Sequence, residues 1–129
     1  MNHDKDIIKT FVKQTLGCAC PEEVFEHIDC KSNIQLNDIL LSNKINIGNR
    51  LLIYIVDTNK PGSIKNILPL LFNAGIKERD SLGFNRFRLV LVTDKVDEIK
   101  EVAESLFTTI NKDEKVHLHI VHQEKVPEF

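Results

Sequence analysis

Short runs of apolar residues alternate with helical patterns along this chain. Residues 50–57 (RLLIYIVD) and 86–93 (RFRLVLVT) are almost continuously aliphatic and β-branched between polar boundaries. Such runs are typical of strands that are covered on both faces. Residues 116–122 (VHLHIVH) alternate apolar and polar positions and predict a further strand. The pattern therefore indicates a buried sheet.

Helical periodicity fills the segments between these runs. Apolar residues recur three and four positions apart over 64–76 and 99–110, which predicts two amphipathic helices. The same spacing extends over 7–16 and ends at Gly17, a residue that favours a helix terminus. Pro21 then begins a second apolar stripe and predicts another, shorter helix. We therefore expect an N-terminal helical pair before the first strand.

Residues 45–47 (INI) precede Gly48 and Asn49, a pair that favours a hairpin turn. This segment predicts one antiparallel strand beside residues 50–57. Because strands and helices otherwise alternate, we expect right-handed crossovers between parallel strands. The predicted fold is a single α/β domain, residues 1–129. It contains a mainly parallel mixed sheet of about four strands, one antiparallel hairpin strand and helices on both faces.

Charge and composition narrow the classes of partner. The 17 basic and 19 acidic residues give a formal net charge of −2, which makes nucleic acid an unlikely partner. No window approaches the ~18 apolar residues of a membrane span, so we expect no membrane partner. The N-terminal segment is charged and lacks the apolar run of a secretion signal, which predicts a cytoplasmic protein. A protein partner is compatible with all of these features.

All three cysteines of the chain lie close together in the N-terminal segment. Cys18 and Cys20 fall at the predicted helix junction, where a helix N-terminus favours the thiolate form. Thiolates bind metals such as zinc and attack disulfides, so this pair is the candidate metal or redox site. Cys30 is expected at the far end of the second helix, too distant to share one metal ion. The alternative is that the cysteines are small buried apolar residues.

Two histidines, His117 and His119, occupy alternate positions of the last predicted strand. Side chains two residues apart share a strand face and stand roughly 6–7 Å apart, a separation that metal sites use. They are candidate ligands for the cysteine site if the N-terminal helices pack on that face. The alternative is an edge strand whose polar face happens to carry histidines.

A further set of polar residues follows the two buried strands, namely Asp57, Lys60, Ser63 and Asp94. Parallel strands would bring these residues to one carboxyl edge, where open α/β sheets bind ligands. The chain has no G-x-G-x-x-G or G-x-x-x-x-G-K-[ST] sequence, so no phosphate-binding motif supports this site. Turn formation and helix capping explain the same residues without a ligand.

Arginines mark the opposite, amino edge of the same strands. Arg50 and Arg86 begin the two runs, and Arg88 has the same parity as Arg86 and shares its strand face. Together they predict a small basic patch for a protein partner. Solvated strand ends are the alternative explanation.

Three segments carry a resemblance to a known family, namely TLGCACPEEVF at 15–25, GFNRFRLVLVTD at 83–94 and KVHLHIVHQ at 115–123. Together they make the chain similar to an uncharacterised family of small prokaryotic α/β proteins. No activity is established for that family. The resemblance therefore adds no mechanism and no site residues.

Three functional hypotheses follow from these patterns. The first is a thiol-based site at Cys18 and Cys20, acting in metal binding or redox exchange. The second is a non-enzymatic interaction or regulatory module with structural cysteines. The third is a small-ligand pocket at the rim between Asp57 and Asp94. No G-x-S-x-G, H-E-x-x-H or kinase-type sequence is present, so the patterns favour a protein without a catalytic cycle.

Overall fold

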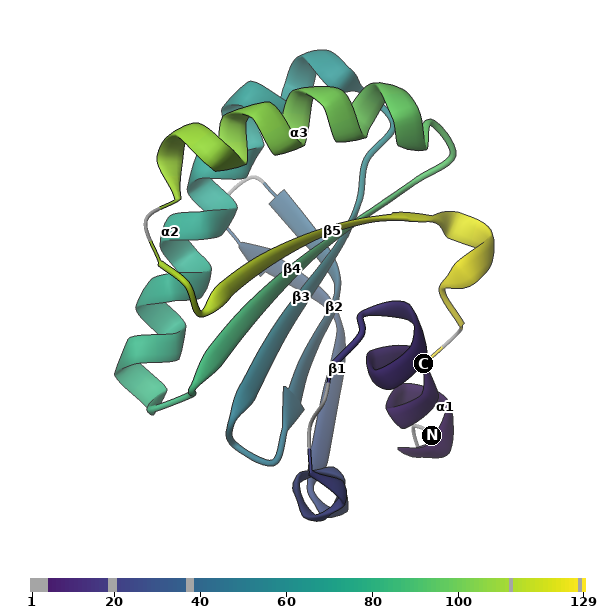
Figure 1. Ribbon diagram of the computed structural model, residues 1–129, viewed down its shortest axis with the longest axis vertical. Coiled ribbons are helices and arrows are strands. Elements are labelled where there is room, and N and C mark those ends of the chain that lie inside the picture. The colour runs from purple at the N-terminus through teal and green to yellow at the C-terminus, as the bar shows by residue number, and fades with distance from the viewer. Residues whose placement is uncertain (1–4, 19–20, 37–38, 112, 128) are drawn as a thin grey trace.

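A computed structural model describes residues 5–18, 21–36, 39–111, 113–127 and 129. Among these residues five strands form one mixed sheet in the order β1-β2-β3-β4-β5 (Figure 1). Strands β1 to β3 pair antiparallel, and β3 to β5 pair parallel. The predicted mixed α/β sheet is confirmed, but the sheet is not mainly parallel, because two of its four strand pairings are antiparallel. The bounds are Ile28–Leu36 for β1, Ile39–Ile47 for β2, Leu51–Asp57 for β3, Arg86–Thr93 for β4 and Val116–His122 for β5.

The predicted number of about four strands is wrong, because the prediction omits β1. Residues Glu22–Glu26 form only a short 3₁₀ helix, η2, in place of the predicted second helix. Cys30, expected at the end of that helix, lies in β1 opposite Ile45 of β2. Most residues of β1 are exposed or half-buried, so its apolar pattern is weak. Its pairing with β2 stabilises it, and pairing between segments is not encoded in local periodicity.

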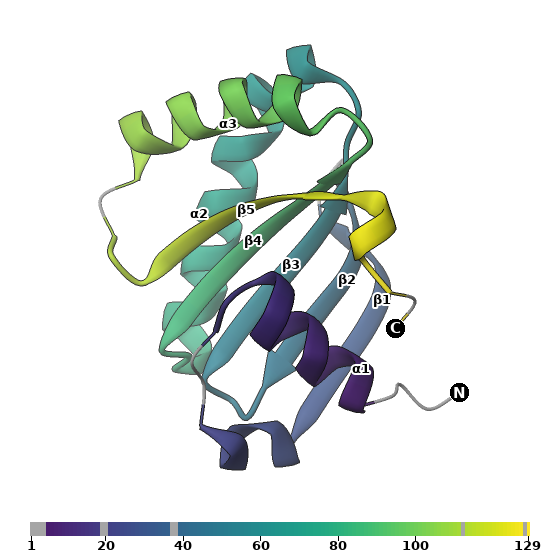
Figure 2. The ribbon, with the colours of Figure 1, turned by 45° about the vertical axis from the view of Figure 1, so that its right-hand side comes forward.

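Two helices, α2 (Ile64–Leu82) and α3 (Val96–Ile110), lie on one face of the sheet (Figures 1 and 2). Each connects neighbouring parallel strands, and both crossovers run in the same direction, which places both helices on that face. We call it the helical face. A Cβ added to Gly75 of α2 would lie 2.1 Å from the buried ring of Phe87 in β4. The close approach of helix and strand therefore requires glycine at this position.

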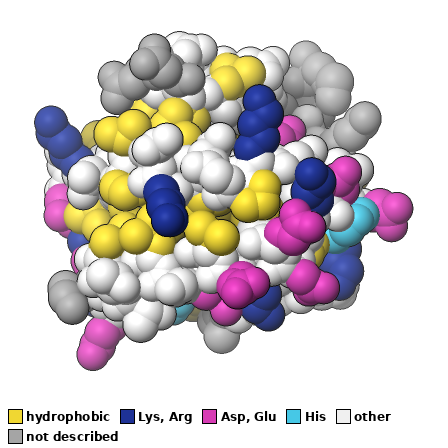
Figure 3. All heavy atoms as spheres, turned by 90° about the horizontal axis from the view of Figure 1, so that it is seen from above, with side chains coloured by type: hydrophobic (Ala, Val, Ile, Leu, Met, Phe, Trp, Pro, Cys, Tyr) yellow, Lys and Arg dark blue, Asp and Glu magenta, His cyan; other side chains and the backbone are white. Residues whose placement is uncertain are grey.

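The end of the molecule where α3 lies is seen from above in Figure 3, where hydrophobic side chains appear between charged ones. Leu70 and Ile110 of the two helices are among the exposed apolar residues. Single exposed apolar side chains are ordinary on a protein surface. No helix in the described ranges has the length and apolar character needed to cross a membrane.

The N-terminal segment lies on the opposite side of the sheet from α2 and α3 (Figure 2). Helix α1 (Lys5–Thr10) continues into a π-helical turn, η1 (Phe11–Thr15). Ile8 is fully buried in a core that also contains residues of β2, β3 and β4. The ring of Phe129 packs edge-on against Phe11 with 5.3 Å between the ring centroids. We call this side of the sheet the N-terminal face.

Candidate functional site

A cavity of about 740 Å³ opens on the N-terminal face, at the edge where β3 and β4 begin. We call it the amino-edge cavity. Its lining combines arginines and histidines with two glutamates, a cysteine and apolar residues. The described lining residues are Gly17, Cys18, Pro21, Glu23, Val24, Glu26, His27, Ile47, Gly48, Arg50, Leu51, Asn85, Arg86, Arg88 and His117.

This cavity joins residues of two sequence-based candidates, the cysteine and histidine site and the separate arginine patch. Arg88 of β4 pairs with His117 of β5 across the parallel ladder. Both side chains lie on the N-terminal face, because successive residues of a strand alternate with positions such as Phe87 that face the helices. Cys18 reaches the same cavity from the end of η1, and Arg50 and Arg86 lie at its exposed edge. The predicted arginine patch, one strand histidine and one cysteine therefore share a single cavity.

Arg88 is the most buried charged residue of this lining, with 8% of its surface exposed. Its Nη1 donates a hydrogen bond to the Leu16 carbonyl oxygen at 3.0 Å and lies 2.9 Å from Nε2 of His119. Its Nε is buried without a partner in the described part of the chain, and no carboxylate of that part forms an ion pair with it. Burial and the charge of Arg86 lower the pKa of the guanidinium. The described residues therefore provide no counter-ion for a buried charge.

The two histidines of β5 relate differently to Arg88. Burial, the charge of Arg88 and the neighbouring His117 lower the pKa of His119 to about 4, so His119 is neutral at pH 7. Because arginine only donates hydrogen bonds, the neutral His119 accepts one through Nε2. His117 lines the cavity, and burial together with Arg88 and Arg86 lowers its pKa. Its buried Nε2 has no partner among the described residues, as is also true of Arg88 Nε.

The cysteines occupy two separate environments. Cys18 is disulfide-bonded and lines the amino-edge cavity. Cys20 lies outside the described residues. Cys30 is a free, buried thiol in β1, and burial raises its pKa, with Asn43 Nδ2 3.7 Å from its sulfur. A raised pKa disfavours the reactive thiolate form of Cys30.

No metal site is formed by the part of the chain that the structure describes. Nowhere in those ranges do three His, Cys, Asp or Glu side chains gather closely enough to hold a metal ion. The charge of Arg88 beside both strand histidines also disfavours a cation. A zinc site at Cys18 and Cys20 therefore stays a prediction.

Residues of the predicted carboxyl-edge rim are engaged with one another. Asp57 accepts a hydrogen bond from Ser42 at 3.1 Å. The side chain of Asn59 accepts from the Thr93 hydroxyl at 2.8 Å and from the Asp94 amide at 3.0 Å. Lys60 and Ser63 stand together in the turn before α2, where the Ser63 amide donates to the Lys60 carbonyl. None of the four predicted residues lines the amino-edge cavity, and a ligand site at this rim stays a prediction.

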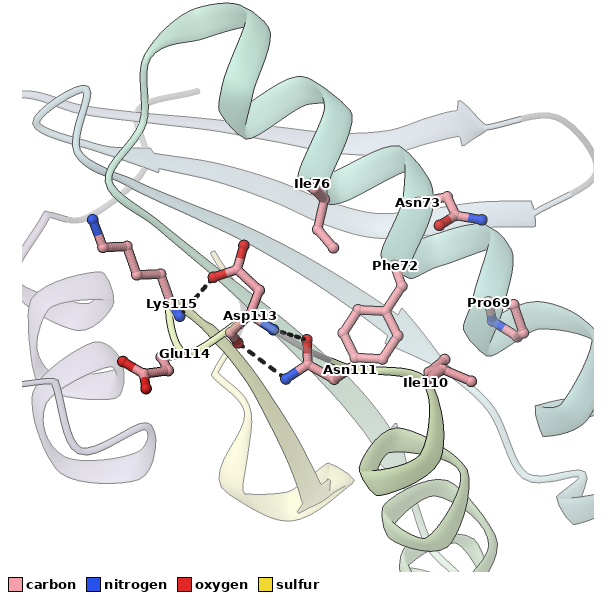
Figure 4. Close-up of a pocket in the computed structure, with 9 residues that line it drawn as sticks. All are labelled: Pro69, Phe72, Asn73, Ile76, Ile110, Asn111, Asp113, Glu114 and Lys115. Carbon is pink, nitrogen blue, oxygen red and sulfur yellow. Dashed lines mark hydrogen bonds between the residues drawn. The ribbon is translucent and has the colours of Figure 1, made fainter.

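A second cavity, of about 680 Å³, is shown in Figure 4 and is lined by α2, the end of α3 and the turn before β5. The Asn111 side chain donates to the Asp113 carbonyl at 3.0 Å and accepts from the Asp113 amide at 3.2 Å. A carboxylate oxygen of Asp113 lies 2.7 Å from Nη2 of Arg79. Asp113 therefore pairs with a buried arginine, whereas Arg88 has no carboxylate partner among the described residues.

One wall of the amino-edge cavity is absent from the sequence-based prediction. Glu23, Glu26 and His27 come from η2 and the residue after it, in a segment predicted as a regular helix. The Leu16 carbonyl that accepts from Arg88 is a backbone group, which leaves no signal in a sequence. Only Gly17, with φ of +70°, marks the turn that brings this segment to the cavity.

The chain matches no protein-family model, no curated protein and no solved structure. The resemblance seen in the three segments therefore stays a prediction. The candidate site rests on the contacts of this chain alone.

Proposed function

We propose that the protein binds a small anionic ligand in the amino-edge cavity, with Arg88 as the buried anchor. The observation that carries the proposal is the guanidinium of Arg88, which is 8% exposed and has no carboxylate partner among the described residues. Burying an unpaired charge costs several kcal/mol, and a bound anion offsets that cost. Arg88 lines the cavity, and a guanidinium forms strong, charge-assisted hydrogen bonds to an anion.

The remaining charges of the lining narrow the ligand class. Arg50 and Arg86 are exposed at the edge of the cavity and add positive charge where a ligand would enter. Glu23 and Glu26 line the same cavity and repel a polyanion. A ligand with one acidic group, such as a carboxylate, a sulfonate or a phosphate ester, suits this arrangement better than nucleic acid. Binding, rather than a catalytic cycle, is the function that these contacts support.

The thiol-based role expected from Cys18 and Cys20 is the second candidate. Its supporting observation is that Cys18 is disulfide-bonded and lines the same cavity as Arg88. A regulatory module acting through a protein partner, and a ligand pocket at the rim of Asp57 and Asp94, have no comparable supporting contact. Both stay predictions.

Calorimetric titration with sulfate and with ethanesulfonate at constant ionic strength tests the anion site. We expect saturable binding, and an anion concentration 100 times the Kd should stabilise the protein by about 2.7 kcal/mol. Arg88→Gln removes the charge while keeping a donor for Leu16, and should weaken binding by at least about tenfold. Absence of binding to the wild type, or equal binding to Arg88→Gln, would refute the proposal.

Arg79→Gln is the matched control. Arg79 is 7% exposed, close to the value for Arg88, but it is paired with Asp113 and Asp80. Its substitution should lower the free energy of unfolding by about 1 kcal/mol, because it removes ion pairs with two carboxylates that are partly exposed to solvent. The affinity for sulfate should stay within about twofold of the wild type. Equal loss of affinity in both variants would assign the effect to general destabilisation.

A further inference from the structure

We propose that two copies of this chain associate through the outer edge of β5, which pairs antiparallel with β5 of the second copy. The sheet order β1-β2-β3-β4-β5 places β1 and β5 at opposite borders of the sheet, each with one strand neighbour (Figure 1). A border strand presents a row of backbone N–H and C=O groups that a further strand can pair with. This association does not require an anion at Arg88.

The backbone groups on the outer edge of β5 belong to alternate residues. The Lys115 carbonyl oxygen accepts from the Phe87 amide of β4 at 3.0 Å, so Lys115 and every second residue after it face β4. Leu118 and Ile120 have the other parity, and their N–H and C=O groups therefore point away from β4. Among the described residues, neither takes part in a backbone hydrogen bond outside the ladder with β4. These outer groups can therefore pair with a further strand.

The two border strands differ in the features that protect an edge from pairing. Strand β1 carries Asp29 and Lys31, and Asn33 has φ of +54°, which interrupts the regular strand conformation. Charged side chains and local irregularities of this kind hinder pairing with another chain. The seven residues of β5 (VHLHIVH) include no lysine, arginine, aspartate, glutamate or proline, and none has a positive φ. Of the two borders, β5 is therefore the one that favours pairing.

A second copy of β5 suits this edge because the strand is compatible with itself. Both strands overlap along their whole length when the two-fold axis passes beside His119, the middle residue of β5. Leu118 then lies opposite Ile120 of the second copy, which gives an apolar cross-strand pair. Burial is the main cause that lowers the pKa of both His117 and His119, so these rings are neutral at pH 7 and do not repel their copies.

The charges that flank β5 complement each other in the same arrangement. Glu114 and Lys115 precede the strand, Glu124 and Lys125 follow it, and all four are exposed. None of them takes part in a salt bridge within the described ranges. Antiparallel pairing brings the start of one strand beside the end of the other, so an acidic and a basic residue of each copy meet at both ends. The flanking charges therefore favour a second copy as the partner.

The expected dimer is weak. A strand of seven residues is about 23 Å long, and pairing along this length buries less surface than the roughly 1,600 Å² of a standard interface. We therefore expect a Kd of about 10–100 µM. Sedimentation velocity of the full chain from about 5 to about 500 µM covers this range and should show the mean mass rising toward twice that of the monomer. A monomer at every concentration would overturn the proposal.

Amide hydrogen exchange, followed by NMR at both ends of this range, locates the interface. The amides of Leu118 and Ile120 should exchange about threefold or more slowly at the high concentration, because the monomer fraction falls by that factor. The control is the outer edge of β1, to which Ser32 and Ile34 belong, because odd-numbered residues of β1 face β2. Their amides should exchange equally at both concentrations. Protection of the β1 edge, or none at Leu118 and Ile120, would place any dimer contact elsewhere and contradict the proposal.

A matched pair of lysine substitutions assigns the association to one border. Leu118 and Ile34 are both half-buried residues that pack against the same apolar cluster, one in each border strand. Leu118→Lys adds a charge at the proposed contact and should raise the Kd by at least about tenfold, whereas Ile34→Lys should dimerise like the wild type. Dimerisation that Leu118→Lys leaves unchanged, or that Ile34→Lys weakens equally, would overturn the proposal. If Leu118→Lys does not fold, the amide exchange of the wild type decides.

Discussion

Two arginines, one on each side of the sheet, are similarly buried but have different hydrogen-bond partners. Arg79 of α2 is 7% exposed, and Arg88 of β4 is 8% exposed. Nη2 of Arg79 lies 2.7 Å from Asp113 and 2.9 Å from Asp80, and chiefly the bond to Asp113 raises its pKa. Arg88 has a backbone carbonyl and a neutral histidine instead, and burial lowers its pKa.

The difference between them lies in the partners rather than in the burial. A buried guanidinium with carboxylates stabilises the fold around it, whereas one without carboxylates lowers stability until an anion arrives. The charge of Arg79 is therefore balanced within the protein, although its Nη1 is buried without a hydrogen-bond partner among the described residues. On the N-terminal face, Arg88 has no counter-ion among the described residues, and the proposed anion would supply one.

The largest expected effect is a loss of stability from a substitution on the helical face that leaves anion binding on the N-terminal face unchanged. Phe87 is fully buried and packs edge-on against Tyr54 with 4.9 Å between centroids. Phe87→Ala should lower the free energy of unfolding by about 3–5 kcal/mol, through lost burial and the cavity left behind. The sulfate affinity of the folded protein should stay within about twofold, because Arg88 projects from the opposite face of the strand.

Urea unfolding and calorimetry measure these two quantities. Phe87→Leu, which leaves a smaller cavity, should give an intermediate loss of stability and the same affinity. A fall in sulfate affinity that tracks the loss of stability across both variants would show that the two faces are not independent.

The second largest effect is the pH dependence of the free energy of unfolding that His119 causes. The pKa of His119 is about 4 in the folded protein, against an ordinary value of 6.5. The unfolded chain takes up a proton as the pH falls below about 6.5, and the folded protein does so only near pH 4. The free energy of unfolding should therefore fall by about 2 kcal/mol between pH 6.5 and 4.5, a loss that denaturant unfolding at several pH values measures.

The substitution His119→Gln keeps an acceptor for Arg88 and removes the titration. It should reduce the pH dependence in this window, and the lowered pKa of His117 should leave a smaller dependence of the same sign. His122→Gln is the matched control on the same strand, because it leaves His119 and its contact with Arg88 in place. A wild-type slope that persists in His119→Gln would assign the titration to another group.

The smallest effect concerns the turn that carries Cys18 to the cavity. Gly17 has φ of +70° with no other atom within 4 Å of an added Cβ, so Gly17→Ala should cost about 1 kcal/mol through backbone strain alone. Gly62→Ala is the control, because Gly62 has equally open space and no positive φ. Thermal unfolding of the two variants should differ accordingly. Equal stabilities would show that this turn relaxes at no cost.

Local patterns were sufficient for the parallel half of the fold. Strands β3 and β4 are continuous apolar runs, and α2 follows the spacing of an amphipathic helix, so each is recognisable alone. Strand β1 is different, because its exposed polar residues carry no clear period and its partner β2 determines its conformation. The short apolar stripe after Pro21 predicted a regular helix. The local sequence does not show that this segment ends after one short 3₁₀ helix and that the chain then pairs with β2 from Ile28 onward.

The candidate site was likewise predicted only in part from the sequence. Residue types and strand parity identified Cys18, His117 and Arg88 as candidate site residues. They linked His117 to the cysteine site only conditionally and assigned Arg88 to a separate patch. Parity also indicated that the strand histidines share one face. It did not indicate that Arg88 is buried and unpaired, since burial depends on what covers the face.

The sequence by itself determined the strand and helix periods, the parallel core and the residues that carry charge or sulfur. Only the tertiary structure decided that the N-terminal segment lies over the amino edge of β4, that Arg88 lacks a carboxylate among the described residues, and that Cys18 lines the same cavity. The physical reason is that periodicity is a property of neighbours along the chain. The electrostatic environment of a side chain is instead a property of neighbours in space, and here those neighbours lie 72 positions apart, at Leu16 and Arg88.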